Sequence, residues 1–282
     1  MKFIYNQNNI SSVFRVIFIA GSIITLAPIL PHALALEQFS KVIDNPDQEL
    51  IRNNEIAQQI DNASQLPGPP VATASNDHYV LTMGNNILVI NRNGEVWAHN
   101  VGQRIDNASQ IRGAAVAAGN EDRYVLIMGD KILVVNRNGE VWAHNVGQQI
   151  ESAYQIRGAA VATGNEDRYV LTMGDKILVI NQRGEVWAHN VGQQIESAYQ
   201  IRGAAVATGN QDHYILTMGD KILVVNGKGE VWVHNVEQQI DSAYQIRGAA
   251  VATGNEDRFV LNMGNDILVI NRRGEVWQHR IQ

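Results

Sequence analysis

The sequence predicts an all-β protein, a five-bladed β-propeller made of four-stranded antiparallel blades. Three observations lead to this prediction. A 45-residue repeat fills residues 58–282 and places Trp at positions 97, 142, 187, 232 and 277. When residues 150–194 are laid over residues 195–239, 37 of the 45 positions are identical. Each copy holds short apolar runs that end in Gly, Asn or Asp, and four antiparallel strands in about 45 residues are typical of one propeller blade.

Within one copy the apolar runs predict strands at residues 159–163, 169–173, 177–180 and 186–190. The connections are too short for parallel crossovers, so we expect an antiparallel meander. Residues 177–180 are apolar without alternation, which predicts a strand buried on both faces. The small residues Ala159 and Ala160 suit an innermost strand near the axis. A β-solenoid or a row of separate hairpin modules is the alternative architecture.

The five copies span residues 58–102, 103–147, 148–192, 193–237 and 238–282. Copy one departs most, because it carries Pro67, Pro69 and Pro70. Proline cannot donate to a sheet ladder, so we expect the strand there to be irregular or exposed. Residues 275–280 are expected to form the fourth strand of the last copy. Ring closure then depends either on packing between blades one and five or on an extra edge strand from residues 50–56.

Residues 1–35 have the features of a secretory signal peptide. They contain Lys2 and Arg15 but no acidic residue, then an apolar run, then the small-x-small pattern Ala33-Leu34-Ala35. An uncleaved anchor is the alternative. Residues 36–57 form a polar connector that could contain a decayed edge strand. We therefore expect a secreted or periplasmic protein that has no membrane contact after cleavage.

The composition excludes several classes of function. The formal net charge is −6, and it becomes −8 once residues 1–35 are removed, which disfavours nucleic acid as a partner. The chain has no cysteine, so thiol catalysis, thiolate metal sites and disulfides are excluded. We expect no cofactor and no metal site. The oligomeric state is left open by the sequence.

Each copy also carries Trp and His two residues apart, as in Trp187 and His189. Alternation along a strand places both side chains on one face. The favoured interpretation is that Trp fills the gap between blades with His at its rim. The alternative is an aromatic platform for a sugar ring.

The candidate binding residues lie in the longest connection of the repeat, which copies three to five write as Gln-Gln-Ile-(Glu/Asp)-Ser-Ala-Tyr-Gln-Ile-Arg-Gly. A carboxylate, a phenol ring, an amide and a guanidinium recur there, and these groups suit hydroxyl-rich ligands. We expect them to share a face with the turn at Asp175 and Lys176 and with its copy at Asp220 and Lys221. A structural role in joining blades is the alternative. The candidate residues are Glu151, Tyr154, Gln155, Arg157, Glu196, Tyr199, Gln200, Arg202, Asp241, Tyr244, Gln245 and Arg247.

Copies one and two lack the tyrosine, because they read Asn-Ala-Ser at Asn62 and Asn107. The sequence therefore predicts three complete sites rather than five. Repeated modest sites favour multivalent binding over catalysis, since catalysis needs unlike groups that converge once. We predict a non-catalytic, lectin-like protein that binds glycans. A structural or protein-interaction propeller that contacts another exported protein is the competing hypothesis.

In repeat number, repeat length and strand order, residues 58–282 resemble the five-bladed lectin propellers of the tachylectin-2 type. The resemblance implies N-acetylated amino sugars as ligands, with one site per blade formed by loop residues between blades. It rests on no shared motif, so it assigns no ligand residue in this sequence.

Overall fold

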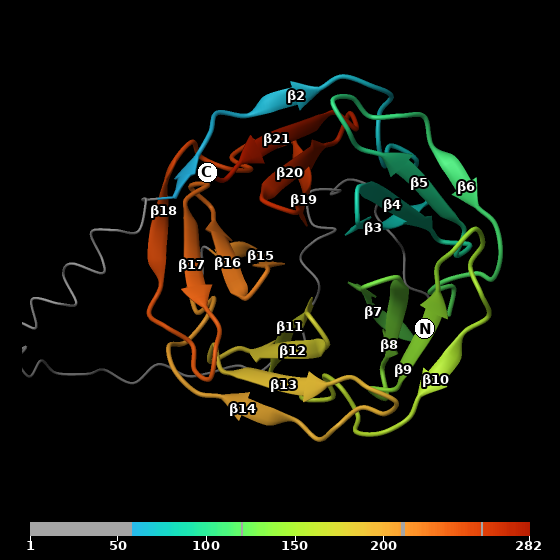
Figure 1. The fold of residues 1–282 in the computed structure, drawn as a ribbon, viewed down its shortest axis with the longest axis vertical. Coiled ribbons are helices and arrows are strands. Elements are labelled where there is room, and N and C mark those ends of the chain that lie inside the picture. Colours follow the sequence, from blue (N-terminus) through green and yellow to red (C-terminus); the bar gives the residue numbers. More distant parts are fainter. Residues whose placement is uncertain (1–57, 120, 210–211, 255) are drawn as a thin grey trace, which may run out of the picture. The chain divides into compact units, whose positions relative to one another are not determined.

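Five β-sheets are arranged in a ring in the computed structural model, which describes residues 58–119, 121–209, 212–254 and 256–282 (Figure 1). All regular structure in these ranges is β-strand. The prediction of an all-β, five-bladed propeller with four antiparallel strands per blade is therefore confirmed.

Each blade has an inner, a second, a third and an outer strand. The inner strands are β3 (Asp77–Met83), β7 (Asp122–Met128), β11 (Asp167–Met173), β15 (Asp212–Met218) and β19 (Asp257–Met263). The second strands are β4 (Asn86–Asn91), β8 (Lys131–Asn136), β12 (Lys176–Asn181), β16 (Lys221–Asn226) and β20 (Asp266–Asn271). The third strands are β5 (Val96–Asn100), β9 (Val141–Asn145), β13 (Val186–Asn190), β17 (Val231–Asn235) and β21 (Val276–Arg280). The outer strands are β6 (Ser109–Ile111), β10 (Tyr154–Ile156), β14 (Tyr199–Ile201), β18 (Tyr244–Gly248) and β2 (Ser64–Leu66), and a short strand β1 (Gln59–Ile60) precedes β2.

We number the blades from the first complete sheet along the chain. Blades 1 to 4 follow chain order, as β3–β6, β7–β10, β11–β14 and β15–β18, and blade 5 combines β19, β20 and β21 with β2. The second strand is the most buried element of a blade, since Ile177, Leu178 and Ile180 have no exposed surface and Val179 only 3%. This confirms the prediction of a strand covered on both faces.

The turn between the second and third strands is held by one asparagine. In blade 3, the Asn181 Oδ1 accepts hydrogen bonds from the amides of Arg183 (2.9 Å) and Glu185 (3.0 Å). Its Nδ2 donates to Glu185 Oε2 at 2.6 Å. Gly184 completes the turn at φ +77°, a conformation that glycine adopts without strain.

The predicted strand at residues 159–163 is wrong. Gly158 has φ +136° and Ala162 has φ +52°, so the chain cannot stay extended there. It crosses between blades instead, and Val161 is fully buried while its amide donates to Gly139 O at 2.9 Å. The apolar run therefore fills the core between blades, and the fourth strand lies at the outer edge (β10, β14) within the segment expected to be a loop.

Neighbouring blades are joined by apolar packing and by backbone hydrogen bonds. Between blades 3 and 4, Leu178 and Ile180 share a buried cluster with Ile222 and Val224. Between blades 2 and 3, the amide of Ile195 donates to Arg157 O at 2.8 Å, and the amide of Ala159 donates to Ile195 O at 2.9 Å. The loops between blades are thus fastened to a rigid scaffold.

The ring closes through the N-terminal strand of the propeller, a strand exchange that is not expected from the sequence, together with the expected apolar packing between blades 5 and 1. Strand β2 pairs antiparallel with β21, and β1 pairs parallel with β18. Residues 275–280 are therefore mostly the third strand of blade 5, and β2 supplies the fourth. The segment 50–56 lies outside the described residues, as do the predicted signal peptide and the whole of the connector.

The prolines of copy one lie directly after β2, which ends at Leu66. The Pro67 carbonyl accepts a hydrogen bond from the amide of Ile105 at 2.8 Å. The Arg157 carbonyl accepts the equivalent bond from the amide of Ile195 at the junction between blades 2 and 3. Pro69 stands where the other copies have alanine and has no amide hydrogen, so the second bond of this junction is absent. The junction between blades 5 and 1 thus has one backbone bond fewer than its equivalents.

Candidate functional site

A cavity of about 540 Å³ lies between blades 2 and 3, and we call it the 2/3 groove. Blade 2 contributes its hairpin turn, the start of β8 and the outer strand β10, and blade 3 contributes its own hairpin turn and the loop after β13. The lining residues are Met128, Gly129, Asp130, Lys131, Leu133, Tyr154, Gln155, Ile156, Gly174, Asp175, Val191, Gly192 and Gln193.

Tyr154 stands at the start of β10, opposite Ala143 of β9. Tyr154 is 42% exposed. The opposite wall is fixed by the amide of Val191, which donates to Asp175 O at 2.8 Å. An aromatic ring, two carboxylates, one ammonium and two amides thus surround this groove on rigid elements.

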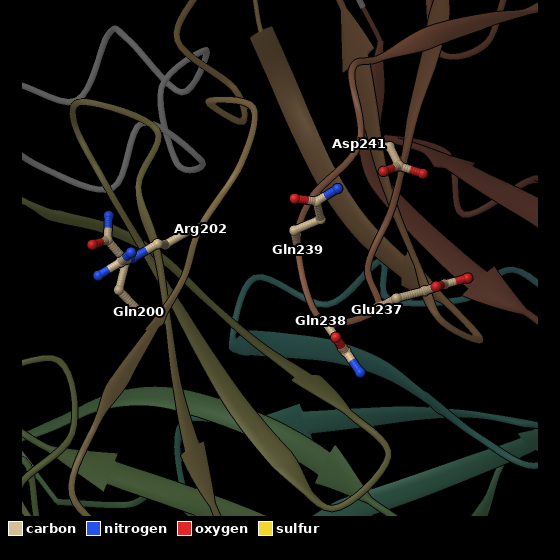
Figure 2. Close-up of a pocket in the computed structure, with 6 residues that line it drawn as sticks. All are labelled: Gln200, Arg202, Glu237, Gln238, Gln239 and Asp241. Carbon is tan, nitrogen blue, oxygen red and sulfur yellow. The ribbon is translucent and has the colours of Figure 1, made fainter.

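A second cavity of about 600 Å³ lies between blades 3 and 4, and we call it the 3/4 cleft. Figure 2 shows Gln200 and Arg202 on one wall and Glu237, Gln238, Gln239 and Asp241 on the other. All six side chains are polar. The loop of the second wall is well held, because the Ile240 amide donates to Arg202 O at 2.8 Å and His234 Nδ1 lies 2.9 Å from Asp241 O.

The groove and the cleft are parts of one type of junction. Gln155, Gly192 and Gln193 in the groove correspond, by the 45-residue repeat, to Gln200, Glu237 and Gln238 in the cleft. Tyr154 lines the groove between blades 2 and 3, and Arg202 lines the cleft between blades 3 and 4.

Of the predicted site residues, the structure places Tyr154 and Gln155 in the 2/3 groove together with Asp175, on one shared face as expected. The lysine in this groove is Lys131, whereas the sequence groups Tyr154 with Lys176. Arg202 lines the 3/4 cleft together with Asp241 of the next repeat, which lies on the opposite wall. The site is thus built across repeats rather than within one.

Two predicted carboxylates have structural partners. Glu151 Oε2 accepts from Asn145 Nδ2 and Glu196 Oε2 from Asn190 Nδ2, both at 2.8 Å. Tyr199 is 41% exposed at the start of β14, and Tyr244 is half-buried against the cluster between blades 4 and 5. Neither cavity is lined by Glu151, Arg157, Glu196, Tyr199, Tyr244, Gln245 or Arg247.

Tyrosine and lysine occur together, blade by blade. Blades 2, 3 and 4 carry Tyr on the outer strand and Lys at the start of the second strand, in the pairs Tyr154 and Lys131, Tyr199 and Lys176, and Tyr244 and Lys221. Blades 1 and 5 have neither residue, and carry the pairs Ser109 and Asn86, and Ser64 and Asp266. This pairing follows the blades and not the sequence copies. Lys131 belongs to the same sequence copy as Ser109, but in the structure it shares blade 2 with Tyr154.

Blade 5 uses its aspartate structurally. Asp266 accepts hydrogen bonds from Gln278 Nε2 at 2.5 Å and from Arg280 Nε at 3.4 Å. In blade 4, Lys221 Nζ donates to Gln58 Oε1 at 3.3 Å. The recurrence of lysine at the start of the second strand is visible in the sequence. Only the strand pairing shows that each of these lysines shares a blade with a tyrosine.

The Trp-x-His pairs are arranged differently from the favoured interpretation. His189 is buried at 4% exposure, and its Nδ1 lies 2.9 Å from Glu196 O. Trp187 is 36% exposed, so histidine and not tryptophan is the buried member. The reason is that the histidine ring satisfies a backbone carbonyl within the blade. Trp232 and Trp277 are partly buried and do pack against the clusters between blades.

Within the described ranges, no group of three or more His, Cys, Asp or Glu side chains could hold a metal ion. The same ranges contain no helix that is long and apolar enough to span a lipid bilayer.

Comparison with known proteins shows similarity in fold only. No family model matches the sequence, and no curated protein matches it. Solved structures match at low identity. One is glutaminyl cyclase from Myxococcus xanthus, with a TM-score of 0.43, 9% identity, and coverage of 79% of this chain and 98% of that one.

Human WBSCR16 matches with a TM-score of 0.36 and 14% identity over 72% of this chain, which spans 57% of WBSCR16. BamB from Moraxella catarrhalis matches with a TM-score of 0.31 and 15% identity, over 71% of this chain and 68% of that one. Likeness at this level carries no function across, so function has to be argued from the site. The resemblance to lectin propellers stays a prediction.

Proposed function

We propose that this protein is a non-catalytic propeller that binds carbohydrate in three junctions, those between blades 2 and 3, 3 and 4, and 4 and 5. The observation that supports this most is the 2/3 groove, where the exposed ring of Tyr154 lies beside Lys131, Asp130 and Asp175. A pyranose has apolar C–H faces and a rim of hydroxyl groups. A stacking ring flanked by charged donors and acceptors matches both features.

The floor of the groove strengthens this proposal. Met128, Leu133, Ile156 and Val191 line it with apolar surface. Ligand sites are commonly apolar with a few well-placed polar groups that fix orientation. Those polar groups stand here on strand ends and short turns, so a ligand would find them already in place.

The blade-wise pairing of tyrosine and lysine supports three sites of this kind. Each single site is open and modest in size, so we expect weak affinity for one sugar and strong binding to surfaces that display many. Linking weak sites can raise the overall affinity by about 10²–10⁴.

A protein-interaction propeller is the second candidate. Trp97, Trp142 and Trp187 are each 36% exposed, in blades 1, 2 and 3. Large exposed aromatic side chains are enriched at protein interfaces. In this case the ligand is another exported protein and the tyrosines contribute to a rim.

A glycan array with the purified protein tests the proposal. The test variant replaces Tyr154, Tyr199 and Tyr244 by Ala, and the matched control replaces Ser64 and Ser109 by Ala at the equivalent positions. We expect sugar-specific signal that the tyrosine variant loses and the serine variant keeps, with both variants folded by circular dichroism. A folded protein without sugar signal would overturn the proposal, and a pull-down of exported proteins would then test the second candidate.

A further inference from the structure

The loop of the 3/4 cleft carries a carboxylate at a position where its equivalents have none. Glu237 stands where the corresponding loops of blades 1, 2 and 3 have glycine, at Gly102, Gly147 and Gly192. Its side chain lies on the wall opposite Arg202 (Figure 2). This inference rests on the proposed function, because it concerns the ligand of the same junctions.

The backbone does not account for this difference. The Glu237 amide donates to Gln239 O at 3.1 Å, and the Gly192 amide donates to Gln194 O at the same distance. A Cβ added at Gly192 would meet nothing within 4 Å, and φ there is not in the left-handed region. The turn accepts either residue, so the side chain of Glu237 is free to serve the cleft.

The charges of the cleft are not neutralised within the described part of the chain. None of the ion pairs between described residues includes Arg202, Glu237 or Asp241. In the equivalent place between blades 2 and 3, by contrast, the one carboxylate, Glu196, accepts a hydrogen bond from Asn190. The 3/4 cleft therefore presents two carboxylates against one guanidinium, and its net charge is negative.

We propose that Glu237 makes the 3/4 cleft selective for a cationic sugar, an amino sugar whose ammonium group is unsubstituted. The ammonium pairs with Glu237 and Asp241, and Gln200, Gln238 and Gln239 hydrogen-bond the neighbouring hydroxyl groups. The junction between blades 2 and 3 has Gly192 at this position and so lacks the Glu237 carboxylate, and we expect it to discriminate less in favour of an ammonium group. One ring thus presents two kinds of junction to a mixed polysaccharide.

Isothermal titration of the full-length protein with a β-1,4-linked glucosamine tetrasaccharide tests this assignment, with cellotetraose as the neutral probe. Glu237→Gln preserves the size of the side chain, and Glu237→Gly recreates the loop of blade 3. For both variants we expect affinity for the glucosamine probe to fall about fivefold at low salt, since one exposed charge pair contributes about that factor. Binding of the neutral probe stays unchanged.

The reciprocal variant Gly192→Glu provides the matched gain, because the side chain enters open space. We expect this variant to bind the glucosamine probe at a second site. We also expect about 0.5 M salt to weaken binding at both the new and the native site, because salt at this concentration screens exposed charges strongly. If the glucosamine probe does not bind, or binds equally well to Glu237→Gln, the inference is overturned. A tyrosine-dependent signal on the glycan array would then leave the proposed function standing, and absence of that signal would remove both.

Discussion

Leu66 lies directly opposite Val276 in the antiparallel pairing of β2 with β21. The first outer strand in the chain thus completes the last blade. Leu66 is 8% exposed and belongs to the buried cluster between blades 5 and 1. The ring is therefore closed by hydrogen bonds and by apolar burial together.

This closure predicts that Leu66→Ala destabilises the whole ring. Removing a buried leucine side chain costs about 2–5 kcal/mol, from lost burial and from the cavity that is left. Ile156→Ala is the matched comparison, because Ile156 occupies the equivalent position of blade 2 and is 7% exposed. We expect similar losses in the free energy of unfolding by urea denaturation. A negligible effect of Leu66→Ala alone would show that β2 is dispensable.

Two glycines of blade 3 separate backbone strain from steric clash. Gly174 has φ +57° and a Cβ there would meet nothing within 4 Å, so Gly174→Ala costs only the strain of the left-handed backbone, about 1–2 kcal/mol. Gly184 has φ +77°, and a Cβ there would lie 2.6 Å from Val206 O and 2.7 Å from Val206 N.

Gly184→Ala must therefore displace the backbone of the crossing to blade 4. Overpacking costs about 1–3 kcal/mol, and we expect this variant to be less stable than Gly174→Ala by that amount. Urea denaturation of the two variants side by side measures the difference. Equal stabilities would mean that the crossing shifts without loss of stability.

His279 predicts a pH dependence of stability. It is 4% exposed, and burial lowers its pKa below the ordinary 6.5, although the Asp61 carbonyl and the charge of Asp257 act in the opposite direction. The unfolded chain therefore binds the proton more readily than the folded one. The contribution to stability is fully present above pH 6.5 and is lost as the pH falls through 6.5 toward the lower folded pKa.

Denaturation midpoints between about pH 7.5 and 5.5, a range that spans the ordinary histidine pKa, check this prediction against His279→Gln, which cannot titrate. We expect the wild-type stability to fall more steeply with acid than that of the variant. The pKa of His78 is also lowered by burial, but His78 is present in both proteins and so cancels in the comparison. Parallel curves would contradict a role for His279.

The pairing of tyrosine with lysine predicts that a further site can be built in blade 1. Ser109→Tyr combined with Asn86→Lys gives this blade the two side chains that blades 2, 3 and 4 share. We expect the number of sugars bound per chain to rise from three to four by titration calorimetry. Each single substitution is the control and should fall short of a full site, and an unchanged number in the double variant would argue against the pair.

Much of the architecture could be predicted from the sequence, because the period is strict and the strands are bounded by turn residues. Residues 177–180 are predicted as a doubly covered strand, and the structure confirms it. The site is predicted less well. Tyr154, Gln155 and Asp175 are grouped correctly, but Lys131 and Glu237 are not assigned to it. Lys131 belongs to the copy before that of Tyr154, and Glu237 is at the far end of the copy that holds Arg202, so only the folded ring shows which cavity each residue lines.

The number of blades and the strands near residues 169–173, 177–180 and 186–190 follow from the amino-acid sequence alone, because repetition and apolar runs bounded by turn residues are local properties of the chain. The boundary between one blade and the next is visible only in the folded ring. The outer strands have as few as three residues, such as Tyr154–Ile156, and so carry little local signal. Their place is set by hydrogen bonds to β9 and its equivalents, and Val276 comes to lie opposite Leu66 only when the ring is closed.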